Sequence, residues 1–246
     1  MCFGAFTKPS RKITGSSVRC NKPEVADTGL EHRLVAHLEV IYPDIDPAAL
    51  KDELMTVMRL SNDMCAPRSH RNDWDQSDVV VIAYGDSVCS DGEKPLVTLK
   101  RFLDQRLANL IDTVHLLPFF PWSSDDGFAV IDYTCVNDAL GDWEDVEAIA
   151  ADYRLMADLV INHSSSRSRW FENFKRGVSP GKNYFRTRRP GEDVSRVVRP
   201  RSTPLFHTFR TVYGDVEVWC TFGPDQVDFD FTEPDVLLEF ARIVRF

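Results

Sequence analysis

The sequence lacks a long hydrophobic run and an excess of positive charge, and each absence excludes a class of protein. The longest apolar clusters, such as residues 79–82, are far shorter than the run of about 18 residues that a membrane-spanning helix needs. The 246 residues carry 29 Lys and Arg against 38 Asp and Glu, and the formal net charge of −9 disfavours a broad phosphate-binding surface. We therefore expect no membrane and no nucleic-acid partner.

Paired cysteines are absent as well. The cysteines form no C-x-x-C pair and no short Cys/His spacing of a zinc site, and they stand at positions 2, 20, 65, 89, 135 and 220. A disulfide framework is unusual in a chain of this size, so reduced thiols and a cytoplasmic location are expected. The turn at residues 85–87 starts neither a G-x-G-x-x-G motif nor a Walker A loop, which disfavours a nucleotide-binding protein.

The composition that remains is that of a globular enzyme, with 43% hydrophobic and 27% charged residues. Residues 1–33 are predicted to be a disordered N-terminal segment. Residues 34–78 are predicted to be a helical preamble, because two stretches of helical pattern flank a break from Pro43 to Pro47 that a helix interior does not tolerate.

Residues 79–163 show the alternation of strands and helices. Apolar runs at 79–84 and 113–117 predict strands buried on both faces, as in a parallel sheet, and a third strand is predicted at 155–161. Amphipathic helices are predicted between them, at 96–110 and 143–151. Repeated βα units of this kind predict an α/β fold, either a barrel or a doubly wound sheet.

Residues 164–231 do not continue this alternation. The stretch is far longer than the median βα loop of about 4 to 6 residues, so it is predicted to be an inserted subdomain without a prompt helix after the third strand. Residues 232–246 then predict a helix that starts at a capping box, Thr232-Glu233-Pro234-Asp235. The sequence is expected to end in the middle of a βα unit.

Three motifs contain polar side chains and are candidates for ligand binding. Residues 118–133 place acids, a glycine turn and aromatics after the second strand, which suits a sugar site but also an ordinary β-turn. The third strand ends in Asn162 and His163, and two interpretations of this pair stay open: the side chains bind a ligand, or they only hold the next loop in place. Asp158, inside the same strand, is interpreted as structural. Residues 219–231 alternate apolar and acidic residues and, taken alone, favour an amphipathic edge strand.

Together and in this order, the three motifs resemble those of a known family. The segments DLVINH, SSDDGFAVIDY and TFGPDQVDFDF look like conserved regions of the α-amylase family of retaining glycosidases, glycoside hydrolase family 13. The longer segments HLLPFFPWSSDDGFAVIDY, NHSSSRSRWFENF and VVRPRSTPLF resemble its sucrose phosphorylase branch, which includes the glucosylglycerate phosphorylases. The resemblance covers roughly residues 70–246.

The resemblance implies a fold and a set of sugar-binding residues. The family folds as a (β/α)8 TIM barrel with a domain B inserted after the third strand, so about three barrel strands and a domain B-like insertion at 164–231 are expected. Asp125 would bind hydroxyls of the glucosyl unit, Phe128 would form an apolar platform beneath it and His163 would donate to it near the reacting centre. Phe222 and Gln226 would line the donor site from the insertion.

The resemblance also implies what is missing. A retaining glucosidase needs a carboxylate nucleophile and a second carboxylic acid. In this family they follow the fourth and fifth strands, so no catalytic residue is expected within residues 1–246. The leading interpretation is a truncated form of a sucrose-phosphorylase-like glucosyltransferase, inactive alone. The full-length relatives transfer glucose from an α-glucoside to inorganic phosphate, giving α-glucose 1-phosphate, and neither a cofactor nor a metal at Asn162 is expected.

The alternative interpretation is a non-catalytic carbohydrate-binding or interaction protein built on half a barrel. In both interpretations the expected partner is a glucoside such as sucrose or glucosylglycerate. Three parallel strands with an open edge expose apolar surface and unpaired backbone groups. Aggregation, or self-association through the open barrel edge, is therefore expected.

Overall fold

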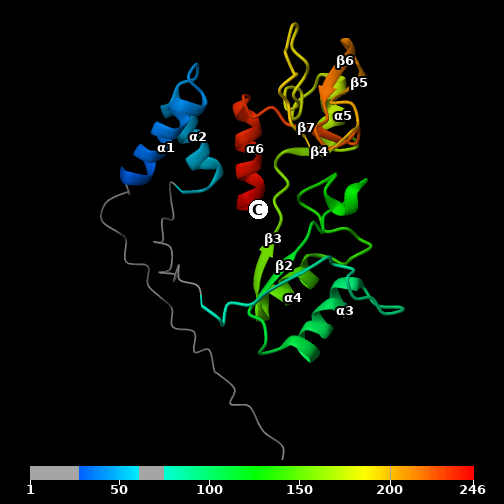
Figure 1. Ribbon diagram of the computed structural model, residues 1–246. Coiled ribbons are helices and arrows are strands. Elements are labelled where there is room, and N and C mark those ends of the chain that lie inside the picture. The colour runs from blue at the N-terminus through cyan, green and yellow to red at the C-terminus, as the bar shows by residue number, and fades with distance from the viewer. Residues whose placement is uncertain (1–27, 61–74, 200) are drawn as a thin grey trace, which may run out of the picture.

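The computed structural model describes residues 28–60, 75–199 and 201–246 (Figure 1). The first half holds the elements α1 (Thr28–Ile41), α2 (Pro47–Val57), β1 (Val80–Ala83), α3 (Pro95–Phe102), a π-helical turn η1 (Leu103–Leu107), β2 (Thr113–Leu116), η2 (Asp125–Gly127), α4 (Trp143–Asp152) and β3 (Arg154–Ala157). The second half holds β4 (His163–Ser165), α5 (Arg169–Arg176), β5 (Phe206–Thr211), β6 (Gly214–Trp219), β7 (Gln226–Asp228) and α6 (Pro234–Arg245).

The three predicted strands form one parallel sheet in the order β1-β2-β3. Val114 and Leu116 of β2 are completely buried, and they belong to one hydrophobic cluster with Leu96 of α3 and Ile149 of α4. These two helices therefore cover one face of the sheet, as βα units of a parallel sheet require. The third strand is shorter than predicted and ends at Ala157.

The prediction that the first strand is buried on both faces is wrong. Ile82 is 63% exposed and Met156 of β3 is 44% exposed. The strand register places both beside His115 of β2, on the face turned away from α3 and α4. Among the described residues no element packs over that face, so only the helix-covered side of β1 is removed from water.

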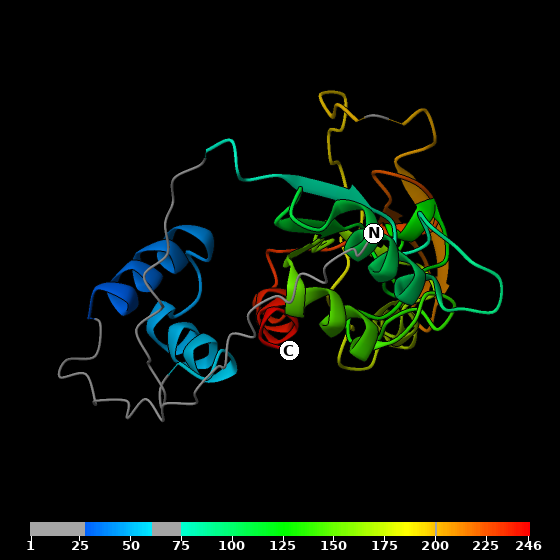
Figure 2. The ribbon, with the colours of Figure 1, turned by 90° about the horizontal axis from the view of Figure 1, so that it is seen from below.

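The N-terminal helices form a hairpin against α6. Leu38 and Tyr42 of α1, Leu50 of α2 and Leu238 of α6 make a second, smaller hydrophobic cluster. Figures 1 and 2 both show α6 between this hairpin and the rest of the protein. Because α1 begins at Thr28, the predicted disordered segment 1–33 extends too far, and its residues 1–27 lie outside the described residues.

The insert, residues 164–231, contains a helix of its own, contrary to the expectation that no helix follows promptly. Ser168 caps α5 by accepting a hydrogen bond from the backbone N–H of Phe171, and Gly177 ends it in the left-handed conformation. The strands β5 and β6 form an antiparallel hairpin, and β7 pairs antiparallel with β4.

Two further expectations for this part of the chain fail. The strand β7 is not amphipathic, because Asp228 is buried and accepts hydrogen bonds from the backbone N–H and hydroxyl of Thr221. Burial raises the pKa of Asp228, although the bonds from Thr221 act in the opposite direction. The predicted capping box is also wrong, since Glu233 is the N-cap of α6 and the Thr232 hydroxyl instead bonds to Asp230.

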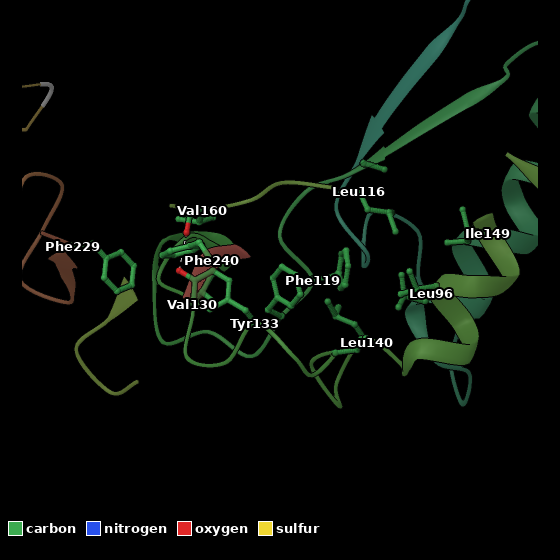
Figure 3. Close-up of a cluster of buried hydrophobic side chains, with 14 of the residues drawn as sticks. Leu96, Leu116, Phe119, Val130, Tyr133, Leu140, Ile149, Val160, Phe229 and Phe240 are labelled. Atoms are coloured by element: carbon green, nitrogen blue, oxygen red, sulfur yellow. Dashed lines mark hydrogen bonds between the residues drawn. The ribbon is translucent and has the colours of Figure 1, made fainter. Parts of the chain in front are cut away.

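One hydrophobic core joins the sheet to the insert. Figure 3 shows buried side chains running from Leu96 and Ile149, through Phe119 and Tyr133, to Phe229 and Phe240. The buried Tyr133 hydroxyl lies 2.8 Å from the carbonyl oxygen of Val160 and 3.0 Å from that of His163, so its single proton is shared between them. Burial raises the pKa of Tyr133, which stays protonated. This bond ties the loop after β2 to the start of β4.

Candidate sugar-binding site

The predicted site residues come from separate segments that meet beyond the carboxyl ends of β1 and β2. Asp125 starts the short turn η2 in the loop after β2. His163 opens β4 and Gln226 opens β7, and the pairing of these two strands brings both side chains to the same place. The carboxyl end of a parallel sheet is where α/β folds place ligand sites.

Three of these side chains touch one another. The Gln226 amide nitrogen Nε2 lies 2.9 Å from Oδ2 of Asp125 and 3.1 Å from Nε2 of His163. The ring of Phe222 lies 4.9 Å from the His163 ring, measured between centroids. Phe128 contributes its carbonyl oxygen, 3.1 Å from Nε2 of His163, while its half-buried ring packs against the core. The structure therefore brings all five predicted residues together.

His163 is held neutral by its burial. Burial lowers its pKa below the ordinary 6.5, although the Phe128 carbonyl and the charge of Asp125 act in the opposite direction. One ring nitrogen cannot donate to Phe128 and accept from Gln226 at the same time, so the two contacts of Nε2 correspond to two tautomers. Nδ1 is buried and has no hydrogen-bond partner among the described residues.

The lowered pKa predicts a pH dependence of stability. The unfolded chain binds a proton at His163 before the folded one does, so this residue removes stability as the pH falls below about 6.5. Replacing His163 with glutamine should therefore reduce the difference in unfolding free energy between pH 7.5 and pH 5.5. Urea unfolding at both pH values measures it, and replacing the exposed His37 with glutamine is the control. An unchanged difference in the His163 variant would contradict the prediction.

Two charged residues of the site carried no prediction. Nη2 of Arg201, a residue of the insert, lies 3.3 Å from Oδ1 of Asp125. Asp225 accepts hydrogen bonds from the hydroxyls of Ser123 (2.5 Å), Ser124 (2.7 Å) and Ser166 (2.5 Å). Both residues stand inside the motifs that carry the family resemblance, but no spacing rule connects them to partners that lie far away in the sequence.

A pocket of about 250 Å³ lies at the ends of β1 and β2. Its lining includes Asp126, the neighbour of Asp125, together with Tyr84, Asp86 and Trp122. The Trp122 side chain is 40% exposed, so an aromatic surface and two carboxylates border this pocket. This combination suits a polyhydroxylated ligand.

Residue types that hold metals do not gather in the described part of the chain. No group of three or more His, Cys, Asp or Glu is arranged there to hold an ion. Asn162 accepts a hydrogen bond from the backbone N–H of Phe229 at its own carbonyl (3.0 Å). The absence of a metal stays a prediction.

The helices among the described residues include none with the length and apolar character to cross a membrane.

Comparison with known families decides which family this site belongs to. A family model of the alpha-amylase catalytic domain matches residues 107–246. The chain belongs to the alpha-amylase family. The prediction of three strands of a TIM barrel is confirmed, because solved alpha-amylase-family structures superpose on the chain.

Several of the similar proteins are phosphorylases. Glucosylglycerate phosphorylase of Spirochaeta thermophila is 49% identical over 172 residues, covering 70% of this chain and 29% of that protein. The enzyme of the same name from Allomeiothermus silvanus is 43% identical over 213 residues, and the match covers 85% of this chain and 37% of that protein. The crystal structure of sucrose 6F-phosphate phosphorylase from Thermoanaerobacter thermosaccharolyticum has a TM-score of 0.60 at 30% identity, and the match covers 69% of this chain and 36% of that protein. The chain spans about a third of the length of the curated relatives it matches.

Proposed function

We propose that residues 1–246 bind the glucosyl unit of an α-glucoside, as the donor side of a phosphorylase active site. The observation that carries the proposal is the meeting of the Asp125, Gln226 and His163 side chains from three segments of the chain, in which the Gln226 amide nitrogen contacts both Oδ2 of Asp125 and Nε2 of His163.

The chemistry of the cluster matches an uncharged sugar. The Asp125 carboxylate accepts hydrogen bonds from hydroxyl groups, and the side chain is 38% exposed, so a ligand can reach it. The neutral imidazole of His163 can bind a hydroxyl without bringing a net charge into the site. The Phe222 ring beside His163 offers an apolar face to the C–H surface of a sugar ring.

The proposed reaction is that of a retaining phosphorylase. Glucose would pass from the glucoside to inorganic phosphate, the co-substrate, giving α-glucose 1-phosphate without a further cofactor. Support comes from the relatives, which are named glucosylglycerate phosphorylase and sucrose phosphorylase. We propose that the nucleophile and the acid belong to later barrel strands, and that residues 1–246 alone bind without turnover. The insert would then correspond to domain B of this family.

The proposed compartment is the cytosol, and the proposed protein partner is a second copy of the chain. Three cysteines lie among the described residues, Cys89, Cys135 and Cys220, and all three are free, which suits a reducing environment. The uncovered sheet face at Ile82 and Met156 offers apolar surface for self-association. Nothing in the net charge of −9 suggests a nucleic-acid partner.

Calorimetry with purified residues 1–246 tests the binding. We expect glucosylglycerate or sucrose to bind at one site, and replacing Asp125 with asparagine to weaken binding by about tenfold or more, because hydrogen bonds to a charged group contribute about 1.5 to 3 kcal/mol. Replacing Asp132 with asparagine is the control, since among the described residues the Asp132 carboxylate bonds within its own turn, to Thr134. A cooperatively melting protein that binds neither glucoside would contradict the proposal. Release of glucose 1-phosphate above background would contradict the absence of turnover.

A further inference from the structure

The Asp225 carboxylate joins three segments at the edge of the site. Its Oδ2 accepts from Ser123 and Ser124, which belong to the loop after β2, and its Oδ1 accepts from Ser166, which follows β4. The backbone N–H of Ser166 also donates to the Asp225 carbonyl, at 3.0 Å. A single side chain of the β6–β7 loop therefore fixes two other loops.

One of these loops holds a strained backbone. Asp125 has φ 57° and Asp126 has φ 50°, so two successive residues with side chains adopt the left-handed conformation. Such conformations persist only where the surrounding structure holds them. The serines bound by Asp225 directly precede Asp125, so the carboxylate restrains the loop where the strain begins.

The same carboxylate also fixes the partner of Asp125. Asp225 directly precedes Gln226, whose amide nitrogen lies 2.9 Å from Asp125. Both ends of the Asp125–Gln226 hydrogen bond are therefore set from one residue: Asp125 through the serines, and Gln226 through the chain. Burial alone raises the pKa of Asp225, but the three serine hydroxyls outweigh burial and lower it, so the carboxylate is ionised.

We propose that Asp225 is a positioning residue that holds Gln226 against Asp125 and thereby sets the affinity of the site for a glucoside. The affinity part of this inference rests on the proposed function. The positioning part concerns the protein without ligand. Replacing Asp225 with asparagine keeps the shape of the side chain but turns one acceptor into a donor, which cannot accept from the serines.

The test compares Asp225→Asn with Asp142→Asn in the full chain. Asp142 is a suitable control because its carboxylate also accepts from several donors, the backbone N–H groups of Glu144 and Asp145 and the Lys94 ammonium, and these contacts belong to the cap of α4 and include none of the site residues. Three quantities are measured: glucosylglycerate affinity by calorimetry, melting temperature, and the side-chain amide resonances of Gln226 by NMR without ligand.

We expect Asp225→Asn to lower the affinity about tenfold and to shift the Gln226 amide resonances, as the loss of a charge-assisted hydrogen bond predicts. Asp142→Asn should lower the melting temperature and leave both other quantities unchanged. Unchanged affinity and resonances in Asp225→Asn, or equal changes in both variants, would overturn the positioning role. If Asp225→Asn does not fold, Ser124→Ala removes one donor and should shift the same resonances.

The outcomes separate the two proposals. If the wild-type chain binds no glucoside while the Gln226 resonances still move only in Asp225→Asn, the proposed function fails and the positioning of Gln226 stands. If the wild-type chain binds and Asp225→Asn binds equally well, the proposed function stands and the affinity part of the inference fails.

Discussion

Replacing Gly127 with alanine is expected to destabilise the protein by about 3 kcal/mol or more and to abolish glucoside binding. Gly127 has φ +108°, a conformation that side-chain-bearing residues rarely adopt. A Cβ atom there would lie 2.7 Å from the carbonyl oxygen of Pro118, so the backbone has to move. Because Gly127 lies between Asp125 and Phe128, that movement displaces both sides of the site.

The matched control for this prediction is Gly92→Ala. Gly92 also has a positive φ, +76°, but a Cβ atom there would meet nothing within 4 Å. Its replacement should cost only the conformational strain, about 1 to 2 kcal/mol. Urea unfolding measures both costs and calorimetry measures binding. Equal losses in the two variants would show that the clash with Pro118 does not matter.

Replacing Phe171 with alanine is expected to destabilise the insert by about 3 to 5 kcal/mol. The Phe171 side chain is completely buried, and its ring lies 4.9 Å from that of Phe185 and 4.7 Å from that of Phe209, both edge to face. The cavity left by the missing ring is bordered by rings from separate segments of the insert, which cannot all move inward together. The insert should therefore lose protection before the sheet does.

Hydrogen exchange followed by mass spectrometry locates the loss, and urea unfolding gives its size. Phe102→Ala is the control, because the Phe102 side chain is 38% exposed at the end of α3 and should cost about 1 kcal/mol or less. Faster exchange in β5 and β6 of Phe171→Ala alone supports the prediction. Exchange that rises equally in β2 would instead mean that the insert and the sheet unfold as one unit.

The sequence predicts those parts of the fold that depend on local pattern. The apolar runs locate β1 and β2, and the helical spacing locates α4, because periodicity reports directly on which residues face a core. The site residues follow from the family resemblance, since Asp125, His163 and Gln226 stand in segments that resemble a family. The pairing of β4 with β7 brings His163 and Gln226 together, and the Gln226 amide reaches Asp125 in the loop after β2.

The parts that sequence could not predict depend on neighbours far away in the chain. The exposure of Ile82 follows from the lack of a covering layer among the described residues, which an apolar run does not reveal. Thr232 bonds to Asp230 and not to the helix start, because a threonine hydroxyl can form either of these local hydrogen bonds. Arg201 and Asp225 reach partners in the loop after β2, and no periodicity connects such residues.

The docking of the α1–α2 hairpin on α6 has a consequence for the order of folding during synthesis. Leu38 and Leu50 leave the ribosome long before Leu238. The hairpin's cluster therefore lacks one wall until α6 has been translated. Contacts between residues so distant in sequence form slowly, since the intervening chain must first be ordered. The N-terminal helices are consequently expected to be the last part of the described structure to settle, although they are the first to be made.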